Sequence, residues 1–414
     1  MTTIAYLANE FPVAVEWYVA EEIRALRRSG FSVVPCTGKS VPRTRVPDAM
    51  RDLAQETLCV RPKSLIQFLL TLFLCIAYRR TLRDLWCRIL FQGSEAWPVR
   101  LRAIAHTFMG ICCAEQLRNY DVAHIHIHHG YYASWVGMTA AQILGVPFSL
   151  TLHGSDLLLN GVYLDTKLKN CAFCLTVSEF NRRHILAHFP SIPSSRVLLH
   201  RMGVAIPVVT IHSVSDARPF TVLSVGRLHP VKHHSFLIQG CFFLKEYGVS
   251  LRCLIAGEGP ERRRLERLIA ELGLQDTVEL LGQIPQEDLA RHYDEADLVA
   301  LTSHSEGIPL TLMEAMARGR LVLAPSITGI PELIKDGETG FLYTKGALEE
   351  FVWRVYQIYR ALSACDSVRR AARKHVIANF ELESNLQILS ELFEQRVGNR
   401  ANEEDYEYPV LQQI

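Results

Sequence analysis

Hydrophobic residues recur along the chain in two alternating patterns. Short, nearly continuous apolar runs are typical of strands buried on both faces, and apolar residues spaced three or four apart are typical of helices. In the first half, the runs predict strands at 3–8, 31–36, 122–129, 147–154 and 172–178, with helices at 18–30, 135–145 and 179–189. This alternation predicts a parallel sheet with helices on both faces.

A second alternating series begins at residue 220. Between the two series, residues 202–219 lack a period and are rich in turn formers, which predicts a linker. The sequence therefore predicts an α/β protein with two Rossmann-like parallel-sheet domains, residues 1–205 and 206–380. Since open parallel sheets bind ligands beyond the carboxyl ends of their strands, we expect the site in a cleft between the domains. The predicted strands of the second series are 220–228, 251–260, 278–282, 297–303, 321–325 and 340–343.

Residues 61–105 interrupt the first series. Their apolar run, "SLIQFLLTLFLCIAY", is shorter than the roughly twenty residues that a membrane-spanning helix needs. It is followed by a helical pattern in which Leu82, Leu85 and Ile89 share one face and arginines lie mainly elsewhere. This segment fits a basic amphipathic helix on a membrane surface, and it equally fits two buried helices with a solvated arginine face. The sequence leaves both interpretations open.

The end of the chain differs from both series. Residues 381–398 predict a C-terminal helix that packs back on the N-terminal domain, and the acidic, aperiodic residues 399–414 predict a disordered tail.

The composition argues against some classes of function for this protein. Lys+Arg 44 against Asp+Glu 43 leaves almost no net charge, which argues against nucleic acid as a partner. Eleven scattered cysteines and an N-terminus without a secretory pattern indicate a cytoplasmic protein. The one CxxC pair, Cys171 and Cys174, could form a redox motif or half a zinc site, but no second pair completes a tetrahedron. We expect buried free thiols.

The stretch "HSEGIPLTLMEAMARG" combines two carboxylates with the start of a helix. Pro309 suits the first helical position and Gly319 the C-terminal stop, so Glu306 precedes the helix and Glu314 lies within it. Free backbone NH groups and the positive end of the helix dipole gather near Gly307. The pattern predicts a phosphate-binding site.

The stretch "SVGRLHPVKHH" ends a predicted strand of the same domain. It places Gly226 at the strand end and the cations Arg227 and Lys232 just beyond it. Two cations at this edge could clamp a diphosphate, although most arginines and lysines are ordinary surface residues. Their occurrence in one domain with the helix start favours the clamp.

Alternating histidines on one strand, His124, His126 and His128, could suggest a metal site. No cysteine or carboxylate lies at a suitable offset, and strand histidines more often line a core or an active site. We therefore expect no metal.

Taken together, these motifs resemble the retaining nucleotide-sugar glycosyltransferases of GT-B fold. The resemblance covers nearly the whole chain and rests on "GRLHPVK", "IAGEGPERRRLERLIAELGL", the segment around "HSEGIPLTLMEAMARG", and "SITGIPELIKDGETGFL". Two glutamates separated by seven residues match the family's motif, at Glu306 and Glu314.

The resemblance implies a role for each of these residues. Arg227 and Lys232 would hold the donor diphosphate, Glu306 the sugar hydroxyls and Glu314 the ribose hydroxyls. A carboxylate can accept two hydroxyl hydrogen bonds, which agrees with these roles. The resemblance also implies that the donor is bound by neighbouring residues of the backbone: Gly226, Gly307, Ile308, Pro309 and Leu310.

The N-terminal half resembles the branch that builds colanic acid and other exopolysaccharides. His153 matches a histidine that touches the donor sugar in the family and is a further catalytic candidate. Glu16, His128 and Asp156 are candidates on the acceptor side. The chain departs from this branch at His129, where phenylalanine is usual, and at Gly130, where alanine is usual.

The resemblance implies transfer of a hexosyl group, with retention, from a nucleoside diphosphate sugar to a glycan or lipid-linked oligosaccharide in polysaccharide biosynthesis. It implies no cofactor or metal, because cations and a helix terminus stabilise the leaving diphosphate. The basic apolar segment adds the expectation of peripheral contact with the inner face of the plasma membrane. A GT-B epimerase or phosphorylase, or a catalytically silent assembly subunit, stays an alternative.

Overall fold

The computed structural model describes residues 1–62, 64–159, 161–208 and 218–398. The chain divides into two compact units. The first contains residues 1–177, 181–200 and the chain from Leu386, and the second contains residues 178–180 and 201–385. The predicted tail, 399–414, and residues 209–217 of the predicted linker lie outside the described residues.

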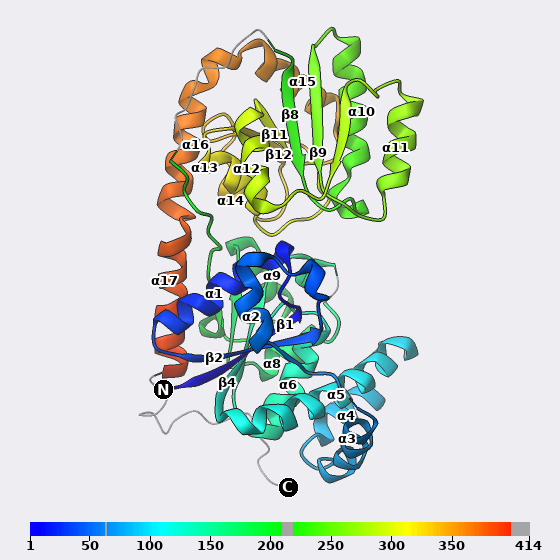
Figure 1. Cartoon of the computed structure of the whole chain (residues 1–414), viewed down its shortest axis with the longest axis vertical. Helices are drawn as coiled ribbons and strands as arrows, with labels where there is room; N and C mark the ends of the chain where they lie inside the picture. Colours follow the sequence, from blue (N-terminus) through cyan, green and yellow to red (C-terminus); the bar gives the residue numbers. More distant parts are fainter. Residues whose placement is uncertain (63, 160, 209–217, 399–414) are drawn as a thin grey trace. The chain divides into compact units, whose positions relative to one another are not determined.

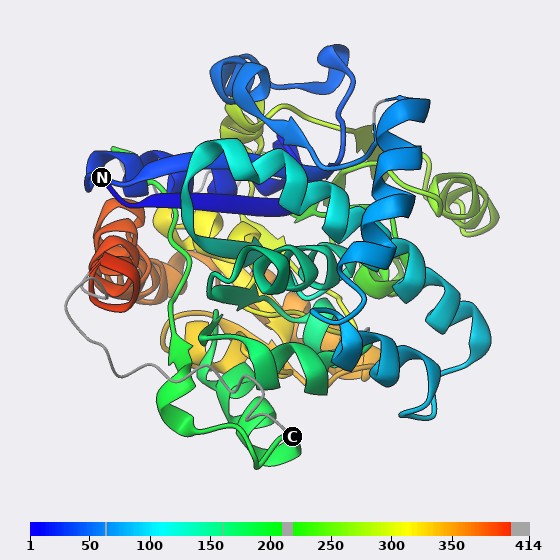
Figure 2. The ribbon, with the colours of Figure 1, turned by 90° about the horizontal axis from the view of Figure 1, so that it is seen from below.

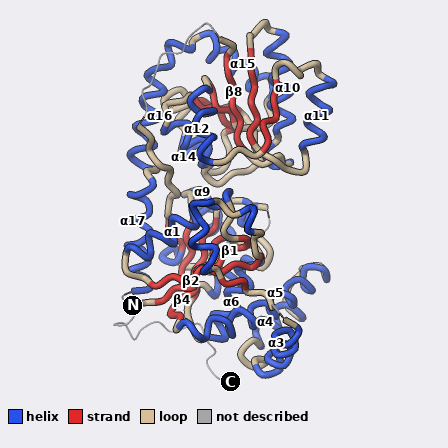
Figure 3. Tube along the Cα trace, viewed as in Figure 1, coloured by secondary structure: helices blue, strands red, loops and turns tan. Residues whose placement is uncertain are grey.

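The first unit is built on a seven-stranded sheet in which every strand pair is parallel (Figure 1). The strand order is β3-β2-β1-β4-β5-β6-β7. Helices flank the strands, as Figures 2 and 3 show. The strands are β1 (Thr3–Glu10), β2 (Ser32–Lys39), β3 (Leu58–Cys59), β4 (Val122–His128), β5 (Phe148–Leu152), β6 (Phe173–Thr176) and β7 (Val197–Leu199).

The helices of this part of the chain mostly connect successive strands. They are α1 (Trp17–Arg28), α2 (Arg51–Glu56), α3 (Leu65–Ala77), α4 (Arg83–Leu90), α5 (Trp97–Leu117), α6 (Tyr132–Leu144), α7 (Ser155–Leu158), α8 (Leu164–Asn170) and α9 (Glu179–His188). The edge strands β3 and β7 escape the sequence analysis because two or three residues are too few to show a period.

The second unit has a six-stranded parallel sheet with the order β10-β9-β8-β11-β12-β13. The predicted α/β architecture of two Rossmann-like parallel sheets is therefore confirmed. The strands are β8 (Phe220–Val225), β9 (Leu251–Ala256), β10 (Val278–Gly282), β11 (Leu298–Ala300), β12 (Leu321–Pro325) and β13 (Phe341–Tyr343). The helices are α10 (His234–Glu246), α11 (Arg262–Glu271), α12 (Gln286–Glu295), α13 (Leu310–Ala317), α14 (Ile330–Leu333), α15 (Leu348–Arg360) and α16 (Asp366–Asn379).

The last helix, α17 (Leu382–Phe393), returns the chain to the first unit. Its buried Leu389 and Phe393 belong to the same hydrophobic core as Ile4 and Tyr6 of β1. The ring of Phe393 packs edge-on against Phe173, with 5.8 Å between centroids. The first unit thus includes both ends of the described chain.

Between β3 and β4, helices α3, α4 and α5 form an insertion beside the first sheet (Figure 1). In α4, Leu85 and Ile89 are buried while Arg83 is exposed, as the amphipathic pattern predicts. The interpretation of two buried helices is wrong for α3, where Thr71 is the one buried residue. Within the described residues, no helix combines the length and the apolar character that crossing a bilayer requires.

Candidate functional site

Lys232 and Glu306 form an ion pair in the second unit. Lys232 ends a short 3-10 helix, Pro230–Lys232, that follows β8, and its Nζ donates a hydrogen bond of 2.6 Å to Oε1 of Glu306. The two side chains keep 20% and 12% of their exposure, so water and a ligand can still reach the pair. The structure thus brings together two of the residues singled out in the sequence.

The Lys232 side chain packs beside the glycine that follows β8. A Cβ at Gly226 would lie 3.4 Å from Cδ of Lys232, so the lysine chain passes directly over the glycine. Two hydrogen bonds hold the turn. Thr302 Oγ1 donates to the carbonyl oxygen of Lys232 at 3.0 Å, and the amide of His304 donates to the carbonyl of Val231 at 2.7 Å. The segment after β11 therefore fixes the backbone of Lys232.

Arg227 is exposed beside Gly226, at the same strand end. Within the described part of the chain, no carboxylate forms an ion pair with its guanidinium. The predicted clamp thus has one cation bound to Glu306 and one facing solvent. An unpaired guanidinium can bind an oxyanion through two parallel hydrogen bonds without first breaking an ion pair.

The predicted helix near Glu306 is α13, and its start differs by one residue. Pro309 is the N-cap, with φ −75° and ψ 118°, rather than the first helical residue, which is Leu310. Gly319, at φ 67°, ends the helix as expected. Ile308 is buried in the core and anchors the turn that contains Gly307. The first amides of α13 lack intrahelical acceptors, as those of any helix do, and can donate to an anion.

Glu314 is held by two residues that the sequence analysis missed. Gln286 Nε2 and the Tyr293 hydroxyl donate to its two carboxylate oxygens, each at 2.7 Å. Burial raises the pKa of Glu314, and these two hydrogen bonds oppose the shift. Gln286 and Tyr293 are seven residues apart on α12, so they share a helix face. Their spacing of seven residues was the one feature of the sequence that could have indicated that both side chains point the same way.

In the first unit, His129 lies between two carboxylates. It follows β4 in the left-handed region, at φ 73°, which is costly for a residue other than glycine. Its Nε2 lies 3.3 Å from Glu16 and its Nδ1 lies 3.6 Å from Asp156. Burial alone would lower the pKa of His129, but the two carboxylates raise it to about 9. His129 is therefore a buried imidazolium at neutral pH.

Asp156 organises the backbone around His129. The carboxylate is fully buried and accepts hydrogen bonds from the amides of Gly130 (2.9 Å), His153 (3.0 Å) and Gly154 (2.8 Å). Burial alone would raise the pKa of Asp156, but His129 and the amide of Gly130 keep it below the ordinary value. A Cβ at Gly130 would lie 2.7 Å from Cδ2 of Leu152, so an alanine here would require the Leu152 side chain to move.

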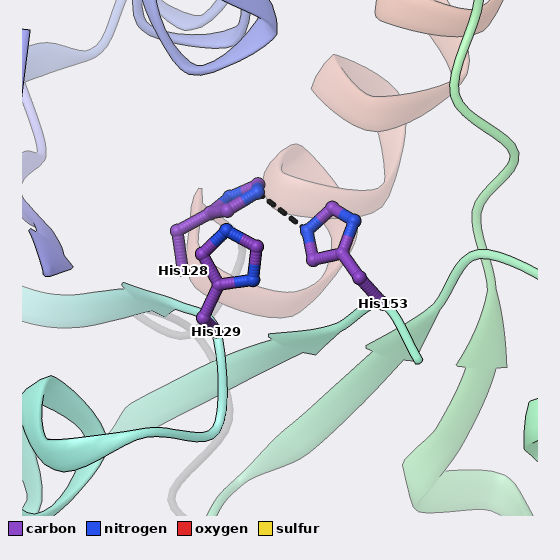
Figure 4. Close-up of side chains that lie close together, drawn as sticks. All are labelled: His128, His129 and His153. Carbon is purple, nitrogen blue, oxygen red and sulfur yellow. Dashed lines mark hydrogen bonds between the residues drawn. The ribbon is translucent and has the colours of Figure 1, made fainter. Parts of the chain in front are cut away.

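His128 and His153 form a neutral pair beside this imidazolium (Figure 4). Their Nε2 atoms are 2.6 Å apart, and His128 Nδ1 lies 3.0 Å from the Tyr6 hydroxyl, which also donates to Glu22. Burial and the charge of His129 lower the pKa of both histidines. One ring must then donate and the other accept, so the pair can relay a hydrogen bond toward a bound hydroxyl.

The ring nitrogens of His128, His129 and His153 lie within 4.8 Å of one another, close enough to share a metal ion. A metal ligand must be a neutral imidazole, whereas the carboxylates hold His129 protonated. The geometry thus offers His128 and His153 as ligands and disfavours the third. The expectation of no metal stays a prediction.

The other histidines of β4 have hydroxyl partners in the core. His124 Nε2 and His126 Nδ1 lie 2.7 Å and 2.8 Å from the Ser149 hydroxyl. Cys171 and Cys174 are buried free thiols, as expected, and burial raises the pKa of Cys171 to about 12. The two core histidines are thus bonded to a serine, and the two thiols are buried and not bonded to each other.

Comparison with known proteins gives three kinds of match. The family described as "Glycosyl transferases group 1" matches residues 211–375. The "Amylovoran biosynthesis glycosyltransferase AmsK" of Erwinia amylovora is 33% identical over 283 residues, which cover 65% of this chain and 69% of AmsK. The "Putative colanic acid biosynthesis glycosyltransferase WcaL" of Salmonella typhimurium is 34% identical, over 48% of this chain. The match spans 51% of the length of WcaL.

Solved structures match over almost the whole chain. Sucrose-phosphate synthase from Thermosynechococcus elongatus has a TM-score of 0.74 at 18% identity, with 95% of this chain and 99% of the other covered. Anabaena HepE in complex with UDP-glucose has a TM-score of 0.69 at 18% identity, with 95% and 100% covered. At such identities the matches establish the fold alone, and they confirm the expected GT-B type.

Proposed function

The chain belongs to the group 1 glycosyltransferases, and from that premise we propose that it transfers a glycosyl group, with retention, from a nucleoside diphosphate sugar to a glycan or lipid-linked acceptor in exopolysaccharide biosynthesis. The observation that carries this proposal is the Lys232–Glu306 pair beside the unpaired Arg227. The relatives AmsK and WcaL, named for amylovoran and colanic acid biosynthesis, support the polysaccharide context.

In the proposed reaction, Arg227, Lys232 and the first amides of α13 bind the donor diphosphate. The bond from the anomeric carbon to the phosphate oxygen breaks, and the acceptor oxygen attacks the same face. The acceptor's proton passes to the departing phosphate oxygen. Negative charge grows on the diphosphate during this step, so fixed cations stabilise the transition state more than the ground state. Glu306 accepts hydroxyl hydrogen bonds from the sugar, and Glu314 accepts them from the ribose.

The first unit supplies the proposed acceptor side. His153 would contact the donor sugar and Glu16 the acceptor, while Asp156 acts through His129 and the backbone. The imidazolium of His129 and the neutral pair of His128 and His153 form a polar network fixed by hydrogen bonds before a ligand binds. Such preorganised groups need little reorientation during the reaction.

A panel of UDP-, GDP- and ADP-sugars, incubated with purified protein and EDTA, tests the proposal. We expect release of the nucleoside diphosphate from one donor class, by hydrolysis or by transfer to an added acceptor, with the same anomeric configuration in the glycoside. An epimerised nucleotide sugar or a free sugar phosphate would instead indicate an epimerase or phosphorylase. Inactivity toward every donor would support a silent subunit, and activity that EDTA abolishes would contradict metal independence.

The acceptor is proposed to lie at an anionic lipid surface, against which α3 packs. Half of the large hydrophobic side chains that the described residues expose lie between 65 and 101, including Ile66 at 79% and Phe73 at 67%. Residues 61–110 contain eight Lys and Arg against two Asp and Glu, in a chain of net charge +1. A second protein copy would need complementary acids, whereas anionic lipid supplies both charge and apolar depth.

Sedimentation with vesicles tests this surface. We expect binding to vesicles that contain anionic lipid, weakened by salt, and lost in the double variant Ile66→Ser/Phe73→Ser. Because both side chains are exposed, the variant should keep its fold. Trp353→Ser, at an exposed position on α15, is the matched control and should still bind. Absence of wild-type binding at low salt, or a stable dimer by light scattering, would contradict the lipid assignment.

A further inference from the structure

The first unit contains a cavity that the proposed chemistry does not use. It lies between α5, α8 and the start of α6, has a volume of about 380 Å³, and is bordered by Gly130 and Tyr131, which directly follow His129. This volume is within the range of small-molecule sites. Its lining contains cations, a histidine and aromatic rings but no carboxylate: Arg102, His106, Tyr132, Trp135, Tyr163 and Lys167.

Lys167 is the buried cation of this cavity. Its side chain is 3% exposed, and its Nζ donates to the carbonyl oxygens of Gly130 and Val162, each at 2.7 Å. Among the described residues, no carboxylate pairs with it. Burial lowers its pKa to about 7. The charges of Asp156 and Asp165 oppose this shift, although neither carboxylate forms an ion pair with Nζ, so an anion in the cavity would favour the charged form of Lys167.

The neighbouring groups add to this potential. Arg102 is exposed on α5, and no described carboxylate forms an ion pair with it. Burial, followed by the charges of Lys167, Arg102 and Arg61, lowers the pKa of His106 to about 4. A neutral imidazole held among cations can donate its NH to an oxyanion.

A second observation comes from Tyr163. The residue is 4% exposed, and its hydroxyl is buried without a hydrogen-bond partner. Its backbone is left-handed at φ 53°, an uncommon conformation for tyrosine. An unsatisfied buried hydroxyl and a strained backbone are each costly to stability and often mark a ligand site.

We propose that this cavity binds a phosphate or diphosphate ester, as the anionic group of the acceptor. Arg102 and Lys167 would neutralise the anion, His106 and Tyr163 would donate to its oxygens, and the aromatic rings would border the attached carbon skeleton. The cavity is lined in part by α5, on which Trp97 and Leu101 are exposed. The proposal rests on the proposed function, since it identifies the anchor of the acceptor.

Calorimetric titration with inorganic pyrophosphate and with geranyl diphosphate tests the cavity. Since the donor site would also bind pyrophosphate, the titrations use the double variant Arg227→Ala/Lys232→Ala as the background. We expect one remaining binding site, weakened about tenfold by Arg102→Gln and several-fold by Tyr163→Phe. Arg83→Gln, at an exposed arginine of α4, is the matched control and should leave the affinity unchanged.

The outcomes separate this inference from the donor proposal. Tighter binding of geranyl diphosphate supports a lipid diphosphate, and equal binding of both probes supports a free or glycan-borne phosphate. Loss of all binding in the double variant would overturn the cavity site while leaving the donor assignment standing. Binding that persists unchanged in Arg102→Gln and Tyr163→Phe, both with wild-type melting temperatures, would also overturn it.

Discussion

The donor-side group of the second unit and the histidine group of the first are built in contrasting ways. Lys232 and Glu306 meet on two turns that follow neighbouring strands, and both stay partly exposed. His129 and Asp156 are buried, and each is held by several hydrogen bonds or ion pairs. Charges near water can exchange partners when a ligand arrives, whereas a buried network keeps its geometry. The first group is suited to binding a charged substrate and the second to positioning a neutral hydroxyl.

The largest effect is expected from substitutions that disrupt the donor-side group, Lys232 and Glu306. Glu306→Ala or Lys232→Ala should lower kcat/KM for donor turnover by at least about a hundredfold, because each removes a group that acts on the transition state. Circular dichroism and melting temperature should stay close to wild type, since both side chains are partly exposed. Lys245→Ala, in the last turn of α10, is the matched control. Wild-type turnover in either site variant would refute the assigned roles.

A smaller effect is expected at Glu314. Glu314→Ala removes the proposed ribose contact and leaves Gln286 and Tyr293 without their shared acceptor, so donor affinity should fall about tenfold. Tyr293→Phe keeps the carboxylate but removes one hydrogen bond that positions it, and should weaken the donor less. Donor Kd from calorimetry measures both. An unchanged Kd in Glu314→Ala would count against the ribose contact.

A third effect concerns not the donor but the pH dependence of stability in the histidine network. The pKa of His129 is raised in the folded state to about 9, so its stabilisation is fully present below pH 6.5 and is lost as the pH rises through 9. Lys167 changes in the opposite sense, because its lowered pKa makes folding more favourable as the pH rises above 7. Measuring wild type against His129→Phe cancels this second contribution.

The stability difference between wild type and His129→Phe should therefore shrink between pH 6.5 and 9.5, by an amount on the order of 3 kcal/mol. Chemical denaturation at several pH values gives the difference. A constant difference over this range would show that His129 is not held as an imidazolium.

The same contrast explains what the sequence could reveal. The donor-side residues could be predicted from short local patterns, because a glycine at a strand end and the start of a helix can each be recognised from nearby residues. Gln286 and Tyr293 share a helix face, but nothing local shows that the face meets Glu314. In the first unit, the resemblance indicated His153, and Glu16, His128 and Asp156 were separate acceptor-side candidates. Their convergence on His129 depends on the packing of separate segments, which the spacing of residues does not encode.

Helix α3 shows another limit of prediction from the sequence. It is apolar on nearly every side, so its periodicity cannot tell which face meets the core. Burial of Thr71, with its hydroxyl bonded to the carbonyl of Gln67 at 2.7 Å, became visible only in the structure. The chain's alternation of strands and helices, by contrast, was sufficient to predict both sheets.

The most direct test of the central claim is a crystal structure with a bound nucleoside diphosphate sugar. The account predicts the diphosphate within hydrogen-bond distance of the Arg227 guanidinium, the Lys232 ammonium and the first amides of α13, with Glu306 on the sugar and Glu314 on the ribose. A donor bound elsewhere, or a diphosphate that contacts neither cation, would contradict it.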